Sequence, residues 1–151
     1  MLRCDHKAKG GARYDERQTA VRGRAFKWAY GTLLTALVIC SVTDGIWNWC
    51  VPFTCCAIAI AASLYPFLWI CVFGEAYWWA DVSRTGQYVT MALLGLMNLG
   101  LALADAARGN FIVDGELQMG GANLALGSAF IYLFVIAMVQ RRRLSRDGED
   151  E

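Results

Sequence analysis

The sequence predicts an all-α membrane protein: a four-transmembrane-helix bundle with a cytoplasmic amphipathic N-terminal helix. Hydrophobic residues make up 57% of its 151 residues and charged residues only 18%, whereas soluble proteins are on average about 45–50% apolar. The charges gather toward the ends of the chain and leave long uncharged stretches at residues 28–43, 45–74, 85–104 and 117–140. A helix needs about 20 apolar residues to cross a bilayer. The polar stripe of a soluble helix is missing from segments such as 57–62, which favours lipid as the solvent.

We expect a single membrane domain over residues 14–140, preceded by a flexible basic arm at 1–13 and followed by a charged cytoplasmic tail at 141–151. The spans are expected at the ranges 27–46, 51–74, 87–106 and 120–140. The first uncharged stretch is short, so this span must extend into its flanks, with Lys27 and Asp44 in the interfacial zone. No small-residue cleavage site follows a short apolar core, so we expect the first span to stay attached.

Two shorter elements are expected outside the spans. Residues 14–27 have acidic side chains at their start and basic ones toward their end, an order that complements a helix dipole. Tyr14, Val21 and Trp28 recur every seven residues, which indicates a face that lies on lipid or packs on the inner loop. Residues 111–113, followed by Asp114 and Gly115, predict a strand that enters a turn, as a small hairpin or a re-entrant lip.

The basic residues predict the orientation. With four spans, all of the 14 lysines and arginines except Arg108 fall on one side of the membrane. Such residues are retained in the cytoplasm. We therefore expect a multi-pass protein of the bacterial plasma membrane with both termini cytoplasmic.

Small and polar residues within the spans predict helix packing. Pairs or triplets of small residues recur every four positions in three of the spans: Ala57 and Ala61; Ala102 and Ala106; Gly121, Ala125 and Ala129. Such repeats let helices approach closely, either within one chain or in a homodimer. Asn98 lies near the middle of the third span, where its amide needs a partner. Thr35, Ser63 or Asn98 of a second copy would provide an interhelical contact, and a ligand is the alternative.

The reactive residue types predict little chemistry. None of the six cysteines forms a C-x-x-C pair and the loop 108–121 has none, which argues against a membrane thiol oxidoreductase. Free buried thiols behave as small hydrophobes, although Cys50 is placed to form a disulfide with either Cys55 or Cys56 on the oxidising side. The only histidine, His6, lies near Cys4 without a second ligand pair. We therefore expect no enzyme, no catalytic residues, no cofactor and no metal site.

Several short motifs together resemble a family of small, uncharacterised four-helix membrane proteins of Gram-positive bacteria. They run from about residue 14 to residue 140 and comprise Asp15-Glu16-Arg17-Gln18, Arg22-Gly23-Arg24-Ala25-Phe26, Glu75-Ala76-Tyr77, Asn98-Leu99, Asp114-Gly115 and Asn123-Leu124. Glu75 departs from the family pattern, which commonly has aspartate there. The resemblance implies the same topology but no activity. Similar proteins are encoded beside small helix-turn-helix regulators, which suggests membrane sensing or accessory signalling.

The sequence thus favours an integral membrane protein of unknown specific function that acts as a non-enzymatic accessory, sensing or interaction protein. Its expected partners are the lipid bilayer, a protein at the cytoplasmic face and further copies of itself, with no nucleic acid. We expect a cytoplasmic clasp or partner contact formed by residues of the lead helix and the inner loop: Arg17, Gln18, Arg22, Glu75 and Asp81. The alternative is a small homodimeric transporter, although the first span has no acid before Asp44.

Overall fold

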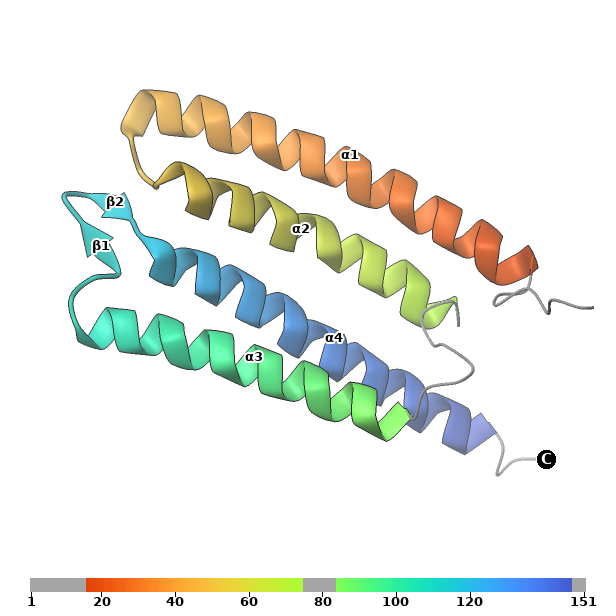
Figure 1. The fold of residues 1–151 in the computed structure, drawn as a ribbon. Coiled ribbons are helices and arrows are strands. Elements are labelled where there is room, and N and C mark those ends of the chain that lie inside the picture. The colour runs from red at the N-terminus through yellow and green to blue at the C-terminus, as the bar shows by residue number, and fades with distance from the viewer. Residues whose placement is uncertain (1–15, 75–83, 148–151) are drawn as a thin grey trace, which may run out of the picture.

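Four long helices and one short β-hairpin make up the described part of the chain. The computed structural model describes residues 16–74 and 84–147. In chain order it contains α1 (Glu16–Trp47), α2 (Pro52–Phe73), α3 (Arg84–Ala107), β1 (Ile112–Val113), β2 (Glu116–Leu117) and α4 (Met119–Asp147) (Figure 1). All four helices are long and apolar enough to cross a membrane. The predicted all-α class, with four helices that fit membrane spans, is therefore confirmed.

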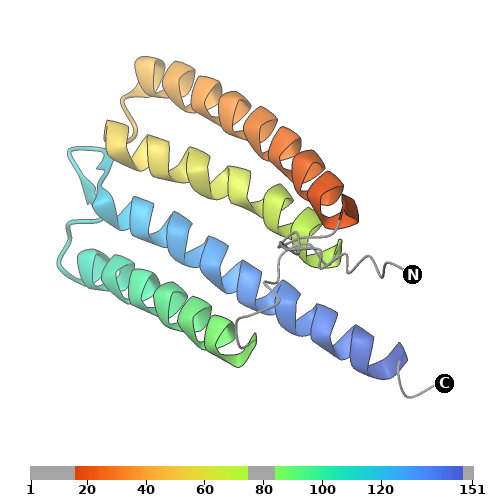
Figure 2. The ribbon, with the colours of Figure 1, turned by 45° about the vertical axis from the view of Figure 1, so that its right-hand side comes forward.

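The helices lie side by side in an open row, in the order α1, α2, α4, α3 (Figures 1 and 2). α1 packs on α2, α2 packs on α4, and α4 packs on α3. The expected four-helix bundle therefore takes the form of two helical hairpins that meet through α2 and α4, with α1 and α3 at the edges. The two inner helices are more buried than the two edge helices. In the most apolar segment of each helix, 39% of the residues are buried in α2 and 33% in α4, against 17% in α3 and 6% in α1.

α1 is one continuous helix of 32 residues. The predicted lead helix and the first span are both part of it, with no break near residue 27. Its first turns lie against the end of α2, where a Cβ built on Gly74 would come 2.8 Å from the Ile70 carbonyl oxygen and would overlap the side chain of Val21. Only glycine permits this close approach. Of the predicted face formed by Tyr14, Val21 and Trp28, Val21 therefore packs against the end of α2.

α2 has clear start and stop signals. Pro52 occupies its first turn, directly after Val51 in an extended conformation, a position where the missing N–H of proline costs nothing. Pro66 lies inside α2, and the helix continues past it to Phe73. At the end, the Gly74 N–H donates to the Ile70 carbonyl.

Some of the small residues that the sequence singled out are buried in the row, whereas Ala106 is exposed and Ala125 is half-buried. Ala57, Ala61, Ala102 and Ala129 are buried. Gly95 faces Ile131 so closely that a Cβ there would come 2.7 Å from the Ile131 Cδ1 atom. A cluster of larger apolar residues fills the space between α2, α3 and α4 further along, and it consists of Leu68, Val72, Met91, Leu133 and Ile136.

The predicted strand and turn form a two-stranded antiparallel hairpin. Ile112 pairs with Leu117 and Val113 with Glu116. The two loop residues, Asp114 and Gly115, have φ values of 53° and 86°. Positive φ at both positions gives the tight hairpin turn for which Asp-Gly is the preferred sequence. The hairpin alternative, rather than a re-entrant lip, is thus the one that forms.

Candidate functional site

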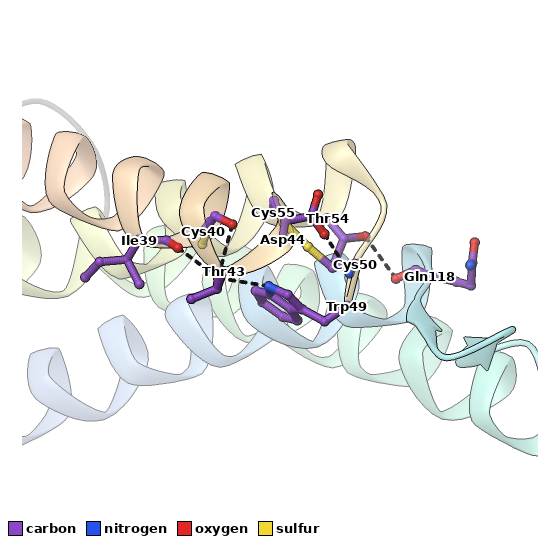
Figure 3. The surroundings of a disulfide bond; sticks show 9 residues. All are labelled: Ile39, Cys40, Thr43, Asp44, Trp49, Cys50, Thr54, Cys55 and Gln118. Carbon is purple, nitrogen blue, oxygen red and sulfur yellow. Dashed lines mark hydrogen bonds between the residues drawn. A yellow bond between two sulfur atoms is a disulfide. The ribbon is translucent and has the colours of Figure 1, made fainter. Parts of the chain in front are cut away.

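One end of the row carries the α1–α2 turn (residues 48–51) and the β-hairpin, and we call it the hairpin end. Several hydrogen bonds of defined geometry join the two helical hairpins there. The Leu117 N–H donates to the Trp49 carbonyl at 2.7 Å, and the Val51 N–H donates to the Leu117 carbonyl at 3.1 Å. The hydroxyl of Thr54, which is fully buried, donates to the Gln118 carbonyl at 2.9 Å (Figure 3). Strand β2 therefore ties the α1–α2 hairpin to the α3–α4 hairpin.

The turn is also fixed from the side of α1. Asn48 adopts a positive φ of 44°, and its N–H donates to the Asp44 carbonyl at 2.7 Å. The indole N–H of Trp49 donates to the Thr43 hydroxyl at 3.0 Å, and this hydroxyl donates to carbonyls of its own helix (Figure 3). The carboxylate oxygen Oδ1 of Asp44 accepts the Cys50 N–H at 3.2 Å. The side chain of Asp44 therefore points toward the turn.

A disulfide joins the turn to the first turn of α2. It links Cys50 to Cys55, with the two Cα atoms 6.2 Å apart. Of the two pairings that the sequence allowed for Cys50, the one with Cys55 forms. The expectation that buried thiols are free is wrong for these two residues, since the loop brings them together, but it holds for Cys40 and Cys71, which are buried and unbonded. Cys40 packs in one apolar cluster with the two disulfide sulfurs.

The three side chains of Asp44, Cys50 and Cys55 form a compact group of donor atoms. One carboxylate oxygen and the two sulfurs all lie within 4.8 Å of one another. Cys50 and Cys55 are only 3% and 8% exposed, and Asp44 is half-buried. Sequence reasoning missed this group because it looked for histidine and paired cysteines at fixed spacings. The signal was Asp44 in the last turn of one helix and Cys55 in the first turn of the next, which a short turn must bring side by side.

The predicted clasp is placed only in part. Arg17 is exposed, and Gln18 and Arg22 are half-buried, all in the first two turns of α1. Glu75 and Asp81 lie outside the described residues, so their contact with α1 stays a prediction.

Asn98 bonds within its own helix. One N–H of its side-chain amide donates to the Leu94 carbonyl at 2.8 Å, within α3. The hydrogen bonds of Asn98 in the described residues do not include Thr35 or Ser63, and Ser63 donates to its own helix at Ile60. A contact with Asn98 of a second copy stays a prediction.

The polar contact between spans that sequence reasoning missed is made by Tyr65 and Ser128. Their hydroxyl oxygens are 2.8 Å apart and join α2 to α4. Ser128 also donates to the Ala125 carbonyl at 2.7 Å, which leaves its oxygen free to accept from Tyr65. The Tyr65 ring packs edge-on against Tyr132 at 4.8 Å between centroids. Both polar residues can be recognised in the sequence, because each lies within an apolar span. The sequence does not show, however, that these two helices are neighbours.

Comparisons with known proteins found no match to this chain among family models, curated proteins or solved structures. The resemblance to small four-helix membrane proteins of Gram-positive bacteria therefore stays a prediction.

Proposed function

We propose that this chain is a multi-pass protein of the bacterial plasma membrane, with both termini in the cytoplasm, that acts as a non-enzymatic accessory, sensing or interaction protein. The observation that carries the proposal is the basic start of α1. Arg17, Arg24 and Lys27 are all exposed there, on an edge helix whose main packing among the described helices is on α2. Exposed cations on an edge helix can meet lipid headgroups and a protein partner at the same time.

The distribution of charge over the four helices supports the orientation. α1 and α3 begin, and α2 and α4 finish, at the end of the row opposite the hairpin (Figure 1). The basic residues of α1, Arg84 and the cluster at 141–143 belong to this opposite end, and Arg108 follows α3 at the hairpin end. This matches the retention of basic residues on the cytoplasmic side.

The length of α1 supports a cytoplasmic extension. Its 32 residues correspond to roughly 48 Å at about 1.5 Å per residue, whereas the hydrocarbon core of a bilayer is roughly 30 Å thick. The basic first turns of α1 therefore extend beyond the apolar layer. A partner at the cytoplasmic face would meet them before any other part of the helix.

A homodimeric transporter is the second candidate. The open row favours it, because a single layer of helices encloses no path and a second copy would have to supply the other wall. The buried polar residues of the described segments are Thr54, Ser63 and Gln140, and the first two donate to backbone carbonyls. Among the described residues, Oε1 of Gln87 is buried without a hydrogen-bond partner, in a hollow between α3 and α4 whose lining is mostly apolar. One such group does not make a polar path across the row, so we favour the interaction role.

Site-specific photo-crosslinking distinguishes the two roles. A photoreactive amino acid at Arg24 is expected to capture a defined cytoplasmic protein in intact cells, and the same amino acid at Arg108 serves as the matched control at the hairpin end. Capture of lipid alone from Arg24 contradicts the interaction role. Proton-linked uptake of a cationic dye into vesicles that contain the purified protein, abolished by Asp105→Asn, would instead support transport.

A further inference from the structure

The hairpin end brings two sulfur atoms and one carboxylate oxygen within reach of a single ion. These donor atoms, from Asp44, Cys50 and Cys55, lie within 4.8 Å of one another. They come from three different segments: the end of α1, the turn and the first turn of α2. In the state described by the structure, the two sulfurs are bonded to each other.

The surroundings hold these three groups in place by bonds that do not involve the disulfide. Backbone hydrogen bonds to Leu117 fix the turn on both sides of Cys50. The Cys55 N–H donates to the Val51 carbonyl at 3.1 Å, within the start of α2. Asp44 is oriented by the Cys50 N–H. Opening of the disulfide would therefore leave two thiols and a carboxylate close together rather than release them into solvent.

We propose that the reduced form of the hairpin end is a zinc site, with the thiolates of Cys50 and Cys55 and the carboxylate of Asp44 as ligands, and that the disulfide is its metal-free, oxidised form. Reduction by a dithiol transfers two electrons and two protons: the Cys50–Cys55 bond breaks, the dithiol closes into its own disulfide, and both cysteines become thiols. Zinc then replaces the two thiol protons, which pass to the solvent. The proposal goes beyond the accessory role and does not depend on a partner at the other end of α1.

The donor set selects the metal class. Zinc combines thiolate and carboxylate ligands in tetrahedral sites, whereas magnesium and calcium take oxygen ligands almost alone. Three protein ligands leave a fourth tetrahedral position for water or an exchangeable ligand, as in zinc sites that react rather than only stabilise a fold. Cys40, which is also buried, packs in the same apolar cluster as Cys50 and Cys55 from the side of α1.

The test uses the full chain in detergent micelles, with Cys4, Cys40, Cys56 and Cys71 replaced by serine, so that only the two proposed cysteine ligands remain. The protein is reduced with dithiothreitol, freed of the reductant without air, and titrated with zinc chloride against a chromophoric chelator. We expect one zinc ion per reduced chain and none per oxidised chain. Uptake of zinc by the oxidised chain at the same affinity, or no uptake by the reduced chain, overturns the proposal.

Matched variants then identify the carboxylate ligand. Asp44→Asn keeps an oxygen that can accept the Cys50 N–H but removes the charge, and it is expected to weaken zinc binding by at least about tenfold, the lower end of the range for lost partners of metal ligands. Asp105→Asn, an acid near the same end of α3, is expected to leave the affinity unchanged. Equal affinity in the two variants shows that Asp44 is not a ligand and contradicts the site.

A second readout does not require the Asp44 variant to fold. Cobalt(II) added to the reduced chain is expected to give the visible bands of a tetrahedral site together with charge-transfer absorption from two thiolates. Cys50→Ser is expected to halve this charge-transfer absorption, and excess zinc to remove it. A cobalt spectrum without thiolate bands overturns the proposal.

Discussion

The two ends of the helical row are held together by different kinds of interaction. At the hairpin end, hydrogen bonds of fixed geometry and a disulfide connect both helical hairpins through β2 and the α1–α2 turn. At the opposite end, the described residues include ring contacts, such as Phe26 on Phe67 with ring centroids 4.9 Å apart, and the guanidinium of Arg143 over the Phe73 ring. Directional bonds fix a single arrangement, whereas apolar contacts in lipid tolerate shifts. We therefore expect the hairpin end to act as a rigid base for the row.

The largest expected effect comes from the disulfide. Cys55→Ser should lower the free energy of unfolding by about 2 kcal/mol, because a short covalent loop no longer restricts the unfolded chain. Denaturant titration in detergent, with and without reductant, measures this. The wild-type protein should lose a similar amount on reduction in the absence of zinc, and the variant should lose nothing. A variant that still responds to the reductant would show that another disulfide carries the effect.

The second-largest loss of stability is expected from a change at the buried Thr54. Thr54→Val keeps the shape of the side chain but leaves the Gln118 carbonyl without its donor, at a cost of about 1.5 kcal/mol. Thr90→Val is the matched control, since Thr90 is exposed and bonds only to its own helix at Gly86. Equal stability of the two variants would mean that the hydrogen bond between Thr54 of α2 and Gln118, the residue after β2, does not hold the hairpin end.

A third change addresses the opposite end. Gly74→Ala places a methyl group where Val21 and the Ile70 carbonyl already lie, so the start of α1 must move away from α2. We expect a loss of about 1 kcal/mol, together with faster hydrogen exchange in residues 16–27 and unchanged exchange at the hairpin end. Gly23→Ala, where a Cβ meets nothing within 4 Å, is the control. Altered exchange at both ends would contradict the independence of the two ends.

The smallest effect is expected from Arg143, whose guanidinium carbon lies 5.5 Å from the centre of the Phe73 ring. Arg143→Gln should cost about 0.5 kcal/mol, as is typical of an exposed cation–π contact. Arg142 is a neighbouring exposed arginine, and Arg142→Gln measures the stability change that comes from losing a charge alone. A loss as large as that of Thr54→Val would contradict a weak, exposed contact between Arg143 and Phe73.

Much of the fold could be predicted from the sequence, because lipid imposes simple rules on length and charge. The uncharged stretches gave the four helices, and the Asp114-Gly115 pair gave the hairpin turn. The order of the helices in the row could not be predicted, since apolar spans carry no pattern that pairs one with another. For the same reason Asn98 was assigned a partner on another helix, whereas it bonds to Leu94 one turn away.

The candidate site was less accessible to sequence reasoning. Cys50 and its two candidate disulfide partners could be recognised, because a short turn brings few other cysteines within reach of Cys50. The contribution of Asp44 could not, since its carboxylate meets the sulfurs only after the turn folds back and the Cys50 N–H orients it. The clasp of Arg17, Gln18 and Arg22 with the inner loop depends on Glu75 and Asp81, which lie outside the described residues.

The central claim is that the two ends of the row face opposite sides of a membrane, with the hairpin end outside the cell. Single cysteines, Asn110→Cys at the hairpin end and Arg142→Cys near the end of α4, can be tested in a chain whose Cys4, Cys40, Cys56 and Cys71 are serine. A membrane-impermeant maleimide added to intact cells is expected to label the first variant, and to label the second only after the cells are opened. Labelling of the Arg142→Cys protein in intact cells, or recovery of either protein in the supernatant after membranes are pelleted, would contradict the claim.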